Sequence, residues 1–169
     1  SAASDVYKRQ WQYHTEEFQG GIQLGEHGAA LCKDTSCVQL DVFQKSLQLA
    51  CKKSGVEIFE YTEITDLSSL DADKTLIAAG AWAQQLVPSV NISPAYGLTL
   101  RAHLPNNQLT QMVRAGRTYV IPHGDDLVLG STLEPKRGFS QIPHKANYIK
   151  LFKECCAYYP PLKNATITQ

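Results

Sequence analysis

The residues that could carry chemistry in this chain are few, and they lack the common metal and phosphate spacings. Its five histidines show no HxxxH or HExxH spacing, so each is interpreted as a surface or turn residue rather than a zinc ligand. The five cysteines form no CxxC pair, and the chain contains neither GxGxxG nor a GKS or GKT loop. We therefore expect no metal site.

Gly80 is the first candidate, because it stands between a strand-like and a helix-like segment. Residues 75–79 form a short continuous apolar run, which is typical of a strand buried on both faces, and residues 81–86 favour a helix. A glycine at such a turn lets the backbone approach a cofactor and leaves N–H groups at the helix start free to bind it. A glycine needed only for packing is the alternative, and the residues alone do not decide.

Tyr119 is the second candidate, because it lies in a predicted hairpin. Residues 117–122 and 127–133 are rich in strand formers, and Gly124-Asp125-Asp126 between them is typical of a hairpin turn. The hairpin places Tyr119 near Gly130, which is a common packing arrangement for an aromatic residue in a strand.

The elements that must position these residues indicate an α+β fold. Helices are expected at 41–53, where Ser54-Gly55 ends the pattern, and at 145–159, where Pro160-Pro161 stops it. Further strands are expected at 56–61, 95–104 and in the alternating stretch 163–169. We predict an antiparallel sheet backed by a helix and flanked by part of an α/β unit.

Composition narrows the class of protein. The 169 residues suit one domain or one domain with part of another, and 43% hydrophobic and 19% charged residues are typical of a globular chain without a membrane span. Sixteen basic residues balance sixteen acidic ones without a basic stripe, so nucleic acid is not an expected partner. The odd number of cysteines favours reduced thiols and a cytoplasmic location.

The first ten residues, SAASDVYKRQ, resemble the translation of a common transposase sequencing adapter. A fusion remnant of this kind is excluded from reasoning about the fold. We therefore expect residues 1–10 to be an artefact, the natural chain to begin at Trp11, and the chain to be cut at both ends.

The order of four segments resembles the FAD-dependent D-amino-acid oxidase superfamily and is glycine oxidase-like. These segments are TLIAAGAW from residue 75, TYVIP from residue 118, LVLGSTLEP from residue 127, and a helix ending in YYPPLKNATI. The resemblance covers about residues 39–169. It implies FAD as the cofactor, a partial Rossmann-like FAD-binding domain at 11–88, a substrate domain at 89–160, and a return to the FAD domain at 161–169.

The resemblance also implies roles for individual residues. Tyr119 matches the tyrosine that contacts the substrate carboxylate, and Leu133 matches an apolar residue near the substrate side chain. The positions that match cofactor contacts in the family are Ile64, Ala79, Gly80 and Trp82. In contrast, Ser93-Pro94-Ala95-Tyr96-Gly97-Leu98 lacks the arginine and glutamine that relatives often carry, which leaves the substrate open.

The activity implied is oxidation of the C–N bond of an amino acid or amine to an imine, with flavin reduction and molecular oxygen as the electron acceptor. An oxidase of glycine or D-amino acids, of the thiamine-synthesis type, is the first hypothesis. A secondary amine, a tRNA-linked amine or a quinone acceptor is the second. A non-catalytic α+β binding domain, in which Gly80 and Tyr119 only pack, is the third, and a homo-oligomer is left open.

Overall fold

The computed structural model describes residues 11–14, 20–26, 28–32, 36–139 and 144–169, so the expected adapter remnant lies outside the described residues. The chain divides into two compact units, each considered by itself below. The sheet unit comprises the described residues of Ser1–Cys37, Tyr96–Glu134 and Ser140–Gln169. The helix unit comprises Val38–Ala95 and Pro135–Phe139.

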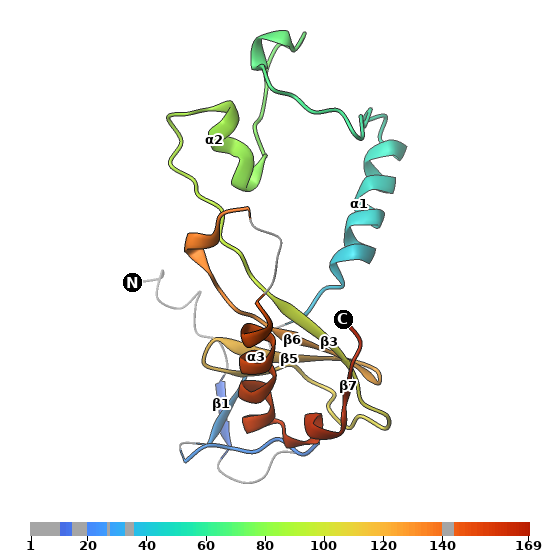
Figure 1. Cartoon of the computed structure of the whole chain (residues 1–169). Coiled ribbons are helices and arrows are strands. Elements are labelled where there is room, and N and C mark those ends of the chain that lie inside the picture. The colour runs from blue at the N-terminus through green and yellow to red at the C-terminus, as the bar shows by residue number, and fades with distance from the viewer. Residues whose placement is uncertain (1–10, 15–19, 27, 33–35, 140–143) are drawn as a thin grey trace, which may run out of the picture. The chain divides into compact units, whose positions relative to one another are not determined.

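A five-stranded antiparallel sheet forms the centre of the sheet unit, with strand order β4-β5-β6-β3-β7 (Figure 1). Its strands are β3 (Thr99–His103), β4 (Val113–Ala115), β5 (Thr118–His123), β6 (Asp126–Gly130) and β7 (Thr166–Ile167). A separate pair of strands, β1 (Trp11–His14) and β2 (Ala29–Cys32), is also antiparallel. The predicted hairpin is confirmed, because β5 and β6 are joined at Gly124-Asp125.

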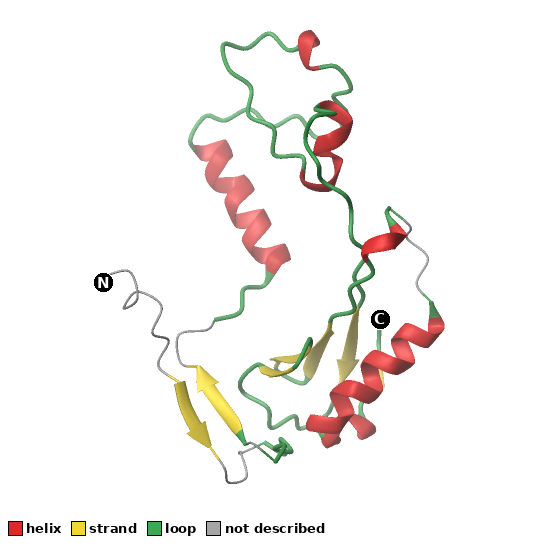
Figure 2. Cartoon of the chain, turned by 90° about the vertical axis from the view of Figure 1, so that its left-hand side faces the viewer, coloured by secondary structure: helices red, strands yellow, loops and turns green. Residues whose placement is uncertain are grey.

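Helix α3 (Lys145–Tyr158) lies along one face of this sheet, as Figures 1 and 2 both show. Its buried residues and the alternate residues of the central strands form one hydrophobic core, because successive side chains of a strand point to opposite faces. The fully buried side chains of this core include Val120, Leu127, Leu129, Leu151, Cys155, Tyr159 and Leu162. The predicted antiparallel sheet backed by a helix is confirmed.

The end of α3 is fixed by proline and by a hydrogen-bonded asparagine. The α-helix ends at Tyr158, and Pro160 begins a short 3-10 helix (η5, Pro160–Asn164) that leads into β7. The hydroxyl of Tyr159 donates to Oδ1 of Asn107 over 2.8 Å, and Nδ2 of Asn107 donates to the carbonyl of Gly124 over 2.8 Å. These bonds join the end of α3 to the turn between β5 and β6.

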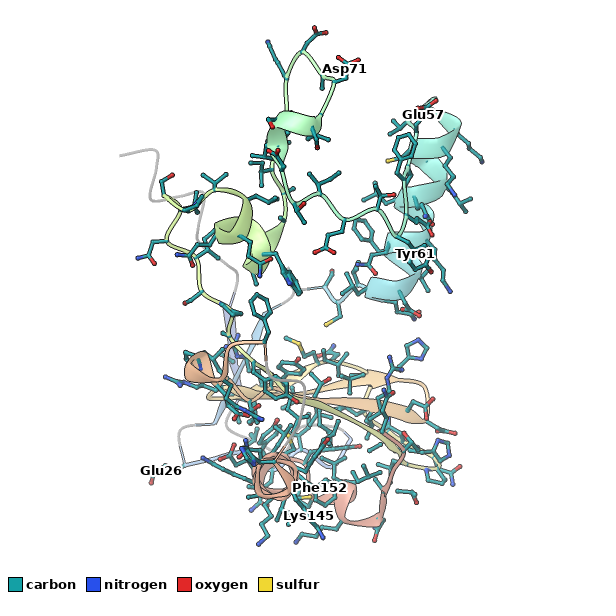
Figure 3. All side chains as sticks on the ribbon, turned by 45° about the horizontal axis from the view of Figure 1, so that its top comes forward. Glu26, Glu57, Tyr61, Asp71, Lys145 and Phe152 are labelled. Carbon is teal, nitrogen blue, oxygen red and sulfur yellow. The ribbon has the colours of Figure 1, made fainter. Side chains whose placement is uncertain are left out.

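The helix unit contains α1 (Leu40–Lys53), two 3-10 turns (η2, Leu67–Ser69; η3, Gly80–Trp82) and the short helix α2 (Ala83–Leu86). The predicted helix at 41–53 and its Ser54-Gly55 end are confirmed, since Gly55 has a φ of +80° that suits glycine. Beyond this turn the chain passes back along α1, and the side-chain amide of Gln48 donates to Glu60. Figure 3 accordingly shows Glu57 and Tyr61 near opposite ends of α1.

Two strand predictions in the helix unit are wrong. Residues 56–61 and 75–79 form no strand, although both sequences are rich in strand formers. A strand requires a neighbour that pairs with its backbone, and no described segment of this unit pairs with either stretch. As a result Leu76, which lies in the stretch expected to form a buried strand, is 92% exposed.

The packing of α3 predicts unequal effects of two truncations on the same helix. Leu151 is 1% exposed and Ile149 is 47% exposed. We expect Leu151→Ala to lower the free energy of unfolding by about 2–5 kcal/mol, because it leaves a cavity in the core. Ile149→Ala serves as the matched control and should cost less than about 1.5 kcal/mol. Urea denaturation followed by circular dichroism measures both, and equal losses would contradict the described packing.

Candidate functional site

Tyr119 projects from the sheet face opposite α3. Its neighbours in β5, Thr118 and Val120, are buried on the α3 side, so the alternation of the strand turns Tyr119 to the other face, where it is half-buried. No side chain of the central strands is fully buried on that face, to which the same alternation assigns Thr99, Arg101, Arg114, Ile121 and Val128. This face is the more open of the two.

The backbone of Tyr119 is held from the α3 side. The thiol of Cys155 donates to the carbonyl of Tyr119 over 3.8 Å, and the hydroxyl of Tyr158 donates to that sulfur over 3.5 Å. Burial raises the pKa of the Cys155 thiol, so this group stays protonated and able to donate. Burial, and then the bond to Cys155, also raises the pKa of Tyr158 far above its ordinary value. Cys155 and Cys156 are both buried, so both thiols pack in the hydrophobic core.

The ring of Tyr119 lies over Gly130, as the hairpin predicts. The two residues are direct partners in the β5–β6 ladder, and the outer ring carbon and the hydroxyl oxygen of Tyr119 occupy the space of a Cβ at position 130. The Tyr119 hydroxyl makes no hydrogen bond to any residue that the structure describes. It is therefore a donor and acceptor that remains available to a ligand.

Arg114 is a neighbour of Tyr119 that the sequence did not reveal. It lies directly opposite Tyr119 in the β4–β5 ladder and is exposed on the same face. Its Nε donates to the carbonyl of Gly116 over 3.2 Å, which leaves the outer guanidinium nitrogens available. Strand β4 has only three residues, and so short a segment gives no alternating pattern that could have indicated it.

Leu133 lines an open hollow of about 870 Å³ in the sheet unit and is 61% exposed. The hollow is bordered by the chain that follows β6 and by α3, whose Asn147 donates to Glu134 over 2.7 Å. Tyr119 is not among the residues that line it. The structure thus brings Leu133, but not Tyr119, to this hollow.

The predicted turn at Gly80 is present in the helix unit. Gly80 opens η3 with a φ of +52°, and a Cβ placed there would meet no described atom within 4 Å. Its N–H donates no hydrogen bond to any described residue. Trp82, in the same turn, is 56% exposed and its ring lies 4.9 Å from that of Phe139, measured between centroids. Phe139 is a partner that no local pattern indicates, because the two residues are far apart in sequence.

Ile64 is half-buried in the same unit, two residues before a capped turn. The Asp66 carboxylate caps η2 by accepting from the backbone N–H and the hydroxyl of Ser68, over 2.9 and 2.7 Å, and these bonds lower its pKa. The candidate residues are thus divided between two units, since Ile64, Ala79, Gly80 and Trp82 belong to the helix unit and Tyr119 and Leu133 to the sheet unit.

The described residues lack two further kinds of feature. They contain no group of three or more histidine, cysteine or acidic side chains that could hold a metal ion. Likewise, no helix within the described residues has both the length and the apolar character needed to cross a membrane.

The family of the chain follows from comparison with known proteins. A family model described as FAD dependent oxidoreductase matches residues 6–169. The chain therefore belongs to this family of FAD-dependent oxidoreductases, which confirms the expected superfamily and its cofactor.

Two curated relatives and one solved structure illustrate the similarity. A D-amino-acid oxidase of Rubrobacter xylanophilus is 31% identical over 115 residues, covering 63% of this chain and 35% of the relative. A glycine oxidase of Geobacillus kaustophilus is 33% identical over 110 residues, covering 53% of this chain and 29% of the relative. The crystal structure of glycine oxidase from Bacillus cereus matches with a TM-score of 0.66 and 19% identity, covering 74% of this chain and 40% of that one.

The similarity in fold supports the mixed α/β architecture with its five-stranded antiparallel sheet. The chain spans about a third of the length of the curated relatives it matches. The activity and substrate of the whole protein are therefore matters for proposal.

Proposed function

We propose that this chain is part of an FAD-dependent oxidase that converts the C–N bond of an amino acid or amine to an imine. The observation that carries the proposal is that Tyr119 is half-buried on the open sheet face and its hydroxyl has no partner among the described residues. Membership of the family and similarity to D-amino-acid and glycine oxidases support the reaction class. A small amino acid such as glycine or a D-amino acid is the proposed substrate.

The helix unit is proposed to contribute to the FAD site. At Gly80 the backbone faces open space and its N–H is free of described partners, so a cofactor could approach the chain closely there. Ala79 and Trp82 share this turn, and Ile64 is a further proposed contact. We infer that residues 11–88 belong to a Rossmann-like FAD-binding domain, with a substrate domain at 89–160 and a return to the FAD domain from 161. When bound, FAD accepts the two electrons lost by the substrate, and molecular oxygen is the proposed final acceptor.

The sheet unit is proposed to orient the substrate. The Tyr119 hydroxyl donates a hydrogen bond to the substrate carboxylate, and Leu133 limits the room for the substrate side chain. The substrate amine must be neutral when its carbon is oxidised, so the pocket must favour the deprotonated amine. Positioning by these side chains is the contribution of the protein to the rate, because the cofactor carries the electron chemistry.

The proposed reaction is tested by reduction of the bound flavin. We expect the full-length protein that contains this chain to show a flavin absorption band. Anaerobic addition of glycine, a D-amino acid or N-methylglycine should bleach it, because the amine delivers two electrons to the cofactor. Admission of air should restore the band and release hydrogen peroxide.

Acetate serves as the control for this experiment, because it carries the carboxylate without an amine and should leave the band oxidised. A bound flavin that none of the three amines reduces would contradict the reaction class. A full-length protein without flavin would favour the non-catalytic binding domain instead.

The role of Tyr119 is tested by Tyr119→Phe in the same protein. Loss of one hydroxyl bond to a carboxylate should cost about 1.5–3 kcal/mol, which is about a ten- to hundredfold rise in KM or fall in kcat/KM. The flavin content should not change. Tyr148→Phe makes the same chemical change on α3 and should leave the kinetics as they are. Equal kinetics for Tyr119→Phe and the wild type with every substrate would remove Tyr119 from the site.

A further inference from the structure

Gly130 differs from the turn glycines of the sheet unit, because a neighbouring side chain rather than a positive φ favours glycine at this position. At Gly124, in the hairpin turn, φ is +63° and the space of a Cβ is open, so the backbone conformation favours glycine there. Gly130 has no positive φ, so the left-handed conformation that favours glycine does not account for it. At position 130 the ring of Tyr119 fills the space that a Cβ would take.

The ring thereby leans over the middle of the sheet. In the ladder, Gly130 is paired with Tyr119 on one side and with Thr99 of β3 on the other. The Tyr119 hydroxyl is among the atoms nearest to the missing Cβ, so it lies above β6 rather than extending past the edge of the sheet. An alanine at position 130 would force the ring and its hydroxyl to move. Its Cβ would overlap both the hydroxyl oxygen and the ring carbon that carries it.

We propose that Gly130 is a positioning residue for the substrate carboxylate, which acts by giving the ring of Tyr119 the space that holds its hydroxyl over β6. The inference rests on the proposed role of Tyr119 and deepens it, because it assigns the position of that hydroxyl to one neighbouring residue. Gly130 itself does not contact the substrate. Its effect on binding must therefore depend on Tyr119.

A double-mutant cycle in the FAD-loaded, full-length protein tests this dependence. Acetate is the probe, and its dissociation constant is measured by calorimetric titration, so the readout does not require turnover. We expect Gly130→Ala to weaken acetate binding about tenfold, similar to Tyr119→Phe. In a Tyr119→Ala background, where the ring is absent, the further change Gly130→Ala should alter the dissociation constant less than about twofold.

Thermal unfolding of the same variants separates steric coupling from a general effect on folding. We expect Gly130→Ala to lower the melting temperature when Tyr119 is present and to leave it unchanged in the Tyr119→Ala background. If Gly130→Ala alone does not fold, recovery of folding by adding Tyr119→Ala supports the contact. Failure to fold in both backgrounds overturns the proposal, because Gly130 would then act independently of Tyr119.

The outcomes for the two proposals differ. If Tyr119→Phe weakens acetate binding and Gly130→Ala does not, the role of Tyr119 stands and the positioning role of Gly130 is wrong. An equal loss of acetate affinity from Gly130→Ala with and without the Tyr119 ring would also overturn the positioning role of Gly130. If Tyr119→Phe leaves acetate binding unchanged, the proposed role of Tyr119 fails, and the positioning role fails with it.

Discussion

The packing of α3 against one face of the five-stranded sheet is the constraint on which the candidate substrate site depends. Val120, Leu127 and Leu129 are buried on the α3 side, and a one-residue shift of register would expose all of them. The same alternation commits Tyr119 to the opposite face. The hydrogen bond from Cys155 to the Tyr119 carbonyl fixes the backbone from the buried side while the ring stays open to a ligand. The core thus determines which side chains are available for chemistry.

The fold could be predicted from the sequence where its elements depend on local signals. Helices α1 and α3 end where glycine and proline predict, and the β5–β6 hairpin forms at Gly124-Asp125. The strands expected at 56–61 and 75–79 did not form, because β structure needs a paired neighbour and no described segment of the helix unit supplies one. An apolar pattern indicates that a segment favours a strand, but the strand forms only where a neighbouring segment pairs with its backbone.

In the candidate site, too, local sequence signals predicted some neighbours, whereas contacts between distant residues could not be predicted. The proximity of Tyr119 and Gly130 followed from the hairpin, because a short turn fixes the register of the two strands. Arg114 beside Tyr119 and Phe139 beside Trp82 could not be foreseen, since one lies on a three-residue strand and the other contacts a residue distant in sequence. The roles of Ile64, Ala79, Gly80, Trp82 and Leu133 came from family resemblance and stay predictions.

We propose that the substrate carboxylate binds on the sheet face opposite α3. The most direct measurement is a crystal structure of the full-length, FAD-loaded protein with acetate bound. We predict an acetate oxygen within hydrogen-bond distance of the Tyr119 hydroxyl, about 2.5–3.0 Å, on the face that carries Arg114. Acetate bound beside the flavin on the α3 side of the sheet, with the Tyr119 hydroxyl bonded only to protein, would contradict this prediction.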